Sequence, residues 1–178
     1  LGRRCTLGFG IPGTISPATG LIKNAYNSPF NGHPLDRDLA ARFNRPVRLM
    51  NDANCFALSE AHGGAAAGAE IIFGAILGTG CGSGIVVRGE LLTGANAVSG
   101  EWGHNPLPWP KDNEIPGLRC DCGKHGCIET FISVTGLSRQ HTASTSEQLS
   151  AEEIVARAKA GDALSASSME HYESRLAR

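Results

Sequence analysis

Three cysteines and one histidine are the residues of this sequence with the clearest capacity for chemistry. The three thiols lie within eight residues, at Cys120, Cys122 and Cys127. The glycines between them permit the sharp backbone turn that lets three thiols converge. A structural zinc site is four-coordinate with sulfur and nitrogen ligands, and His104, across a proline-rich loop, is the best fourth candidate. The spacing favours a closed Cys3His zinc site, with disulfide pairing or a chance cluster of buried thiols as alternatives.

Two glutamates flank this cluster. Glu101 lies three residues before His104, and Glu129 lies two residues after Cys127. A metal that joins His104 to the cysteine loop would therefore bring both carboxylates close together. Carboxylates on short rigid loops suit a polyol, because hydroxyl groups are donors and ionised carboxylates only accept hydrogen bonds.

Asn51 and Asp52 form a second polar site, between an apolar strand over 47–50 and a helix over 53–61. The junction of a strand and a helix is a usual place for functional side chains in an α/β protein. The alternative is a plain helix N-cap, in which Asn or Asp satisfies the first free amides. The sequence leaves these two interpretations open.

A glycine-rich segment over 78–84 joins two apolar runs, at 71–78 and 85–87. It opens no helix, which excludes a P-loop and a dinucleotide-binding motif. Its amides can form an anion-binding concavity, to which Thr79 and Ser83 would add hydroxyl donors. The alternative is a hairpin that only packs closely. A phosphate site beside a polyol site suggests phosphoryl transfer to a sugar hydroxyl, with Asp52 as the base.

Composition agrees with an ordinary globular protein. Of 178 residues, 41% are apolar and 19% charged, and the formal net charge is −1. This balance gives no reason to expect binding to nucleic acid or to an anionic membrane, and the apolar runs are too short to span a bilayer. No secretory leader pattern is present. The remaining cysteines are scattered (Cys5, Cys55, Cys81), so we expect a reducing, cytoplasmic protein.

Apolar periodicity and turn residues predict the secondary structure. The expected elements are strands over 5–11, 47–50, 71–78 (covered on both faces) and 85–87, a hairpin over 14–22, a helix capped by Asp36 and running through Arg42, a helix over 130–135, an exposed linker over 138–149, a helix opened by a Ser150–Glu153 capping box, and a last helix after Asp162.

Several motifs together resemble the ROK family (repressors, open reading frames, kinases). They are Gly10-Ile11-Pro12-Gly13, Asn51-Asp52-Ala53-Asn54, the run from Leu77 to Gly84 continuing through Gly94, Gly100, Gly103 and His104, Glu101-Trp102-Gly103-His104, and the Cys-x-Cys-Gly-x-x-Gly-Cys-Ile-Glu segment ending at Glu129. The resemblance covers essentially the whole chain. Within the family the chain looks most like bacterial fructokinases (manno(fructo)kinases), with N-acetylglucosamine kinases as near neighbours.

The resemblance implies an α/β, actin-like ATPase (ribonuclease H-like) fold of two lobes. It implies phosphorylation of a hexose, fructose first, at its 6-hydroxyl, with ATP, Mg²⁺ and structural Zn²⁺ as cofactors. The residues that match family sites are the base Asp52; the sugar contacts Gly13, Asn51, Asp52, Glu101, His104 and Glu129; the phosphate element Thr79, Gly80, Cys81, Gly82, Ser83 and Gly84; and the zinc ligands His104, Cys120, Cys122 and Cys127.

The chain departs from the family in extent, because the amino-terminal Asp-x-Gly-Gly-Thr element and the later Gly-Gly-rich nucleotide element are absent. We therefore expect 1–178 to be an internal portion of a ROK kinase that carries the sugar-binding and zinc-binding part of the cleft but does not turn over ATP alone. The expected partners are a hexose and ATP, without membrane or nucleic acid, and the parent is expected to be a homodimer. Alternatives are another hexose kinase of the family, such as an N-acetylglucosamine kinase, or a ROK transcriptional repressor that senses sugar.

Overall fold

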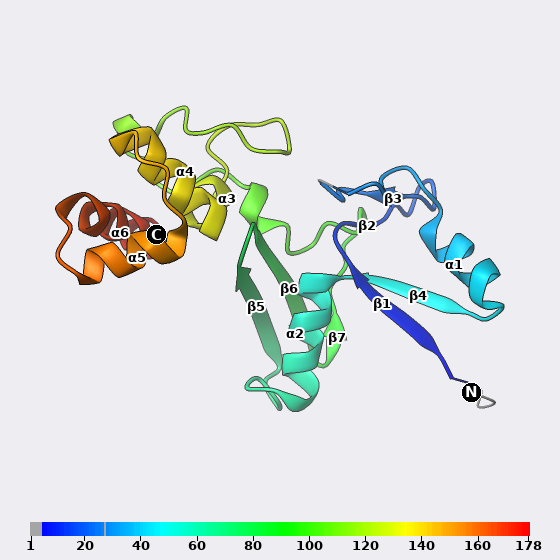
Figure 1. The fold of residues 1–178 in the computed structure, drawn as a ribbon. Helices are drawn as coiled ribbons and strands as arrows, with labels where there is room; N and C mark the ends of the chain where they lie inside the picture. Colours follow the sequence, from blue (N-terminus) through cyan, green and yellow to red (C-terminus); the bar gives the residue numbers. More distant parts are fainter. Residues whose placement is uncertain (1–4, 27) are drawn as a thin grey trace. The chain divides into compact units, whose positions relative to one another are not determined.

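A computed structural model describes residues 5–26 and 28–178 of the chain (Figure 1). The described residues divide into two compact units. Unit 1 takes the residues up to Ala75 together with Ser83–Gly100, and unit 2 takes Ile76–Gly82 together with Glu101–Arg178. The β-hairpin over 71–87 therefore contributes to both units, with its turn in unit 2.

Unit 1 begins with a strand pair, a short hairpin and a helix: β1 (Leu7–Ile11), β2 (Thr14–Ile15), β3 (Ile22–Lys23), α1 (Leu35–Phe43) and β4 (Val47–Asn51). Strands β1 and β4 are parallel, with Ile11 opposite Asn51, and β2 and β3 are antiparallel. These elements confirm the strands, hairpin and helix predicted for this stretch. The predicted cap is wrong, because Asp36 lies inside the first turn of α1 and the N-cap is Pro34, which has no side-chain cap.

A helix packed on a sheet follows: α2 (Asp52–Gly63), β5 (Ile71–Leu77), β6 (Cys81–Val87) and β7 (Glu90–Leu91), with the strands in the order β5-β6-β7. All of it belongs to unit 1 except the end of β5 and the start of β6. Ala57 of α2 packs with Ile72 and Val86 in a buried cluster. The hairpin prediction is confirmed, although β6 starts already at Cys81.

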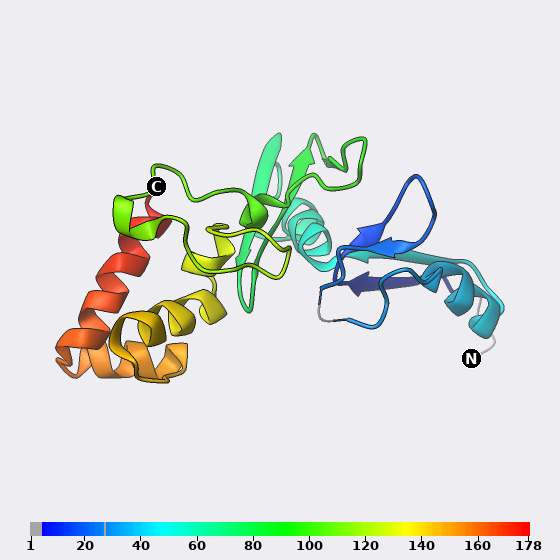
Figure 2. The same cartoon turned by 90° about the horizontal axis from the view of Figure 1, so that it is seen from above.

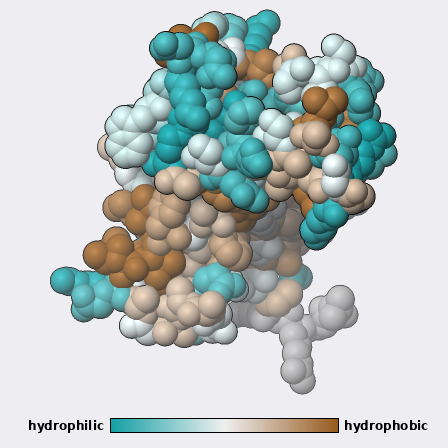
Figure 3. All heavy atoms as spheres, turned by 90° about the vertical axis from the view of Figure 1, so that its left-hand side faces the viewer, coloured by the Kyte–Doolittle hydropathy of each residue, from teal (hydrophilic) through white to brown (hydrophobic). Residues whose placement is uncertain are grey.

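Strand β5 is apolar on both faces but is buried on only one of them among the described residues. Ile72 and Gly74 are buried, whereas Ile71 is 72% and Phe73 54% exposed. The prediction that this strand is covered on both faces is therefore wrong for the described structure. The face of the molecule that Figure 3 draws carries hydrophobic as well as hydrophilic side chains.

Unit 2 combines loops with a group of helices (Figure 2). Its elements are the short 3₁₀ helices η1 (Trp102–His104) and η2 (Asp112–Glu114), followed by α3 (Glu129–Ile132), α4 (Val134–Thr145), α5 (Ala151–Lys159) and α6 (Ala163–Leu176). The Ser150–Glu153 capping box and the helix after Asp162 are confirmed. In the described part of the chain, no helix combines the length and the apolar character needed to cross a membrane.

The predicted linker over 138–149 is wrong, because α4 continues to Thr145. Ser133 caps this helix by accepting from the Gly136 amide, and Leu137 and His141, one turn apart, are buried. The hydroxyls of Thr142 and Thr145 donate to carbonyls four residues earlier in the helix. Such side chains disfavour helix in isolation, so burial of one face outweighs composition here.

Two apolar clusters form the core of unit 2. One contains Cys81, Leu107, Ile128, Phe131 and Ile132, and the other contains Leu137, Ala151 and Ile154. Tyr172 of α6 packs against both clusters. Helix α6 is thereby joined to α3, whose first residue is Glu129.

Candidate functional site

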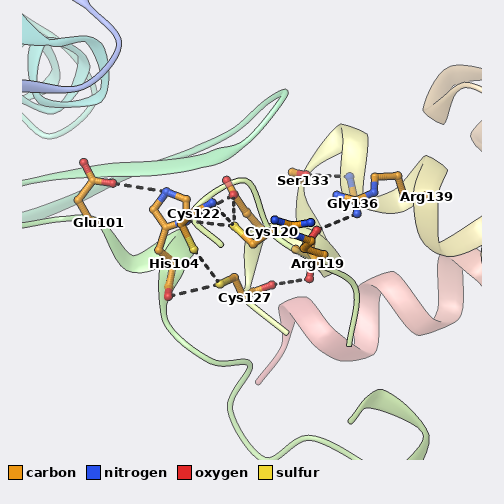
Figure 4. Close-up of polar contacts among 11 residues, drawn as sticks. Glu101, His104, Arg119, Cys120, Cys122, Cys127, Ser133, Gly136 and Arg139 are labelled. Carbon is orange, nitrogen blue, oxygen red and sulfur yellow. Dashed lines mark hydrogen bonds and ion pairs between the residues drawn. The ribbon is translucent and has the colours of Figure 1, made fainter. Parts of the chain in front are cut away.

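The four predicted metal ligands lie together in unit 2 (Figure 4). One ligand atom each from His104, Cys120, Cys122 and Cys127 lies within 4.8 Å of the others. The Cys122 and Cys127 sulfurs are 3.6 Å apart, and Nδ1 of His104 is 3.4 Å from the Cys120 sulfur. Two thiolates on a tetrahedral zinc with bonds of about 2.3 Å would be roughly 3.8 Å apart. The donor set and its spacing therefore fit a zinc ion.

Local turns bring the three thiols together. The Cys120 amide donates to the Lys124 carbonyl, and the Gly123 amide donates to the Cys120 carbonyl. Gly123 and Gly126 have φ of 90° and 68°, a conformation that few residues other than glycine adopt. The proline-rich loop is fastened alongside by a bridge between Pro106 and Cys127, so His104 is carried to the cysteines.

The protonation of the thiols shows what the cluster needs. Burial raises the pKa of Cys120 and Cys127, and the neighbouring Glu129 carboxylate raises both further. Burial would also raise the pKa of Cys122, but hydrogen bonds, first from the Lys124 backbone, lower it. Three thiolates beside a carboxylate need a cation, and a bound divalent metal ion deprotonates its thiol ligands.

His104 lies between the two predicted sugar-binding glutamates. Its Nε2 is 4.0 Å from Glu101 Oε2, and its Nδ1 is 3.4 Å from Glu129 Oε1. All three side chains are about one-third exposed or less. Because Nδ1 faces the Cys120 sulfur, Nδ1 is the nitrogen placed for a metal and Nε2 points toward Glu101. The structure thus brings together the three residues that the sequence analysis grouped around the cluster.

The glycine-rich turn lies beside the same group. A Cβ at Gly80 would stand 2.9 Å from Glu129 Oε2. Next to it, Cys81 is buried, and burial followed by the charge of Glu129 raises its pKa to about 12. A neutral, buried Cys81 serves packing, while Thr79 and Gly80 lie at the tip between the strands.

The second half of the predicted phosphate element has structural partners inside unit 1. The Ser83 hydroxyl is buried and donates to the Gly100 carbonyl at 2.7 Å, so it is not free to donate to phosphate as expected. A Cβ at Gly84 would come within 2.6 Å of the Ala57 side chain. For these two residues the close-packing interpretation of the hairpin is the one the structure supports.

At the strand–helix junction of unit 1, Asn51 and Asp52 have different structural roles. Asn51 is the N-cap of α2, and its Oδ1 accepts from the Ala53 and Asn54 amides. Asp52 is the first helical residue, is exposed, and also accepts from the Ala53 amide. Asn51 therefore acts as the N-cap through its Oδ1, while Asp52 presents a carboxylate to solvent.

Gly13 follows β1 at a turn with φ of 72°. A Cβ there would overlap the Lys23 carbonyl, so the backbone requires glycine whatever ligand it meets. Gly13, Asn51 and Asp52 belong to unit 1, whereas Glu101, His104 and Glu129 belong to unit 2.

Sequence reasoning missed Trp102 and Glu114, both in the segment that carries or follows His104. The Trp102 indole nitrogen donates to the Gly82 carbonyl at 3.0 Å, and Glu114 is a buried acid paired with two arginines. A tryptophan inside Glu101-Trp102-Gly103-His104 was a usable signal, whereas the arginines lie 61 and 64 residues away from Glu114.

The sequence model of the ROK family matches residues 1–178. The chain belongs to the ROK family. It is 40% identical over 180 residues to N-acetyl-D-glucosamine kinase of Shigella boydii, covering 99% of this chain and 59% of that relative. The chain thus spans about three-fifths of the length of that kinase.

Two solved structures of the ROK family are similar to this chain. A glucokinase from Streptomyces griseus, in complex with glucose and AMPPNP, superposes with a TM-score of 0.75 at 28% identity, covering 96% of this chain and 59% of the glucokinase. A ROK transcriptional regulator, a homolog of the E. coli MLC protein, gives 0.73 at 27% identity, covering 96% of this chain and 44% of the regulator. These likenesses confirm the α/β, actin-like ATPase fold predicted from the sequence.

Proposed function

We propose that the whole protein is a sugar kinase that transfers the γ-phosphate of MgATP to the 6-hydroxyl of a hexose. The observation that carries this proposal is the 40% identity to an N-acetylglucosamine kinase across 99% of the chain. The same observation favours N-acetylglucosamine as the substrate over fructose, which the sequence motifs alone had suggested. The similarity to a glucokinase crystallised with glucose and AMPPNP supports ATP as the donor.

The residues take the following roles in this proposal. Asp52 accepts the proton of the attacking hydroxyl, which suits an exposed carboxylate at the start of a helix. Glu101, Glu129 and Nε2 of His104 accept from or donate to sugar hydroxyls, with Gly13 and Asn51 as further contacts. The turn from Thr79 to Gly82 receives phosphate through its amides.

Zinc has a positioning role in the proposal. Bound by His104 and the three cysteines, it would hold two segments distant in sequence at the spacing that the glutamates need. It would also neutralise the thiolates beside Glu129, whose carboxylate accepts from a sugar hydroxyl in this proposal. The metal supplies structure and charge, while the sugar contacts come from the chain.

A sugar panel tests the proposed activity. The whole gene product is assayed with MgATP and, in turn, N-acetylglucosamine, glucose, mannose and fructose, with ADP release measured by a coupled reaction. We expect the highest kcat/KM with N-acetylglucosamine and a value at least about tenfold lower with fructose, because polar groups aimed at an absent substituent lose their partners. Fructose as the best substrate would overturn the specificity, and no turnover of any hexose would overturn the kinase.

A sugar-responsive transcriptional regulator is the second candidate. It is favoured by the structural similarity to the ROK regulator, with its TM-score of 0.73. A regulator binds DNA in a sugar-dependent manner and needs no base. Sugar-dependent release of a DNA duplex together with absence of ATP turnover would favour this candidate over the kinase.

A further inference from the structure

Trp102 lies between Glu101 and His104 but points its indole N–H at the glycine-rich turn. Its Nε1 donates to the Gly82 carbonyl at 3.0 Å. The ring packs against the cluster that contains Cys81 and Phe131. The segment that carries the predicted sugar contacts is therefore bonded directly to the predicted phosphate element, within unit 2.

The backbone of η1 also lies against the turn. A Cβ at Gly103 would overlap the Cys81 carbonyl, so η1 and the turn approach as closely as two backbones can. On the other side of the turn, the Val134 amide donates to the Gly78 carbonyl at 2.8 Å. The turn is thus fixed at both ends, by η1 at Gly82 and by the start of α4 at Gly78.

Fixing these carbonyls also fixes amides. A peptide group is planar, with its C=O and N–H directed to opposite sides. The hydrogen bond from Val134 therefore sets the direction of the Thr79 N–H. The bond from Trp102 fixes the peptide group between Gly82 and Ser83, at which the turn ends. A phosphate-binding turn works through the direction of its amides, so the Trp102 bond bears on the phosphate element although the indole itself contacts no phosphate.

We propose that Trp102 is a positioning residue that couples the sugar contacts to the phosphate-binding turn, so that sugar and nucleotide strengthen each other's binding. This inference rests on the proposed kinase function. A ligand that orders the Glu101–His104 segment also orders the turn through the indole hydrogen bond, and a ligand at the turn acts back on the segment to the same extent. Removing the N–H uncouples the two without removing either set of contacts.

The matched variants are Trp102→Phe and Trp109→Phe. Phenylalanine keeps a ring to pack against the cluster that contains Cys81 and Phe131 but has no N–H. Trp109 is 78% exposed. In the whole gene product, calorimetry gives the Kd of N-acetylglucosamine with and without MgAMPPNP, and their ratio is the coupling factor. We expect Trp102→Phe to lower this ratio roughly threefold to tenfold, the usual net effect of one hydrogen bond. The Kd of sugar alone and the zinc content should stay unchanged, and Trp109→Phe should resemble wild type.

A second measurement needs no variant at this position. In the wild-type protein the indole N–H NMR signal of Trp102 should shift on adding sugar alone and on adding MgAMPPNP alone. A signal that responds to neither, or a coupling factor in Trp102→Phe equal to that of Trp109→Phe, would overturn the coupling while leaving the kinase proposal standing. Wild-type protein that binds neither ligand would overturn both.

Discussion

The two predicted functional regions are held in place by different means. At the Asp52 junction, a five-residue parallel pairing of β1 with β4 leads directly into a twelve-residue helix with an asparagine cap. Around His104, the positions depend on a three-residue 3₁₀ helix, a long proline-containing loop and two isolated backbone bridges. Regular secondary structure holds the Asp52 junction through its own hydrogen bonds. The His104 region depends on side chains from separate segments, so it is more sensitive to the loss of one interacting side chain.

Removing the metal should produce the largest difference in local stability between the two regions. Binding of zinc to such clusters contributes on the order of 10 kcal/mol to folding. Purified protein should hold about one zinc per chain, as four ligands imply. After chelation, hydrogen exchange measured by mass spectrometry should rise sharply over 104–127 and little over β1, β4 and α2.

Two cysteine variants sharpen this test. Cys127→Ser removes a buried ligand and should reproduce the effect of the chelator, whereas Cys5→Ser changes an exposed cysteine in unit 1 and should not. Protein without zinc, or equal loss of protection in both units, would contradict the contrast between a metal-dependent and a metal-independent region.

Asp52→Asn should affect chemistry without affecting structure. The amide keeps an oxygen to accept from the Ala53 amide, so α2 should begin as before. Loss of the proton acceptor should lower kcat by roughly 10²-fold or more, with the Kd of the sugar nearly unchanged. Steady-state kinetics and calorimetry on the whole gene product measure both.

Asp38→Asn is the matched control for this substitution, because Asp38 is an exposed acid in the first turn of α1. It should leave kcat at the wild-type value. If Asp52→Asn also kept full turnover, or if the protein functioned without any ATP turnover, the base assigned to the unit 1 junction would be wrong.

The sequence predicted these two regions for different reasons. The Asp52 junction follows from local pattern, since an apolar strand, a polar pair and a helix are contiguous. The metal cluster could be predicted because cysteine spacing is informative without any knowledge of distant contacts. The helix α4 was missed because its serines and threonines disfavour helix locally, and only burial of Leu137 and His141 against other helices offsets this. The two arginines that pair with Glu114 are 61 and 64 residues distant in sequence, and no local pattern predicts such a pairing.

Glu114 ties the loop that follows His104 to α6 and to the residues after it. It is 6% exposed and lies in the loop between His104 and Cys120. Its carboxylate accepts from Arg175 at 2.8 Å and from Arg178 at 2.8 and 2.9 Å, while Arg175 also stacks 5.0 Å above the Phe131 ring. The loop is thus anchored to α6, as its lack of regular secondary structure requires.

The pH dependence of stability tests this anchor. Burial alone would raise the pKa of Glu114, but hydrogen bonds from Arg178 and Arg175 lower it from 4.5 to about 2. A depressed pKa stabilises the folded state above pH 4.5, and this contribution is lost as the pH falls from 4.5 toward 2. The shift corresponds to about 3 kcal/mol of unfolding free energy.

Denaturant unfolding of wild type and Glu114→Gln, compared at each pH, isolates this contribution, because metal loss in acid affects both proteins alike. The difference should be about 3 kcal/mol at pH 6 and should shrink toward zero near pH 2. Glu147→Gln breaks an exposed pair with Arg157 and should cost about 1 kcal/mol or less. A difference that is independent of pH, or no larger than that of Glu147→Gln, would mean that the loop of unit 2 holds its shape without the buried charge, and the contrast with unit 1 would then rest on the metal alone.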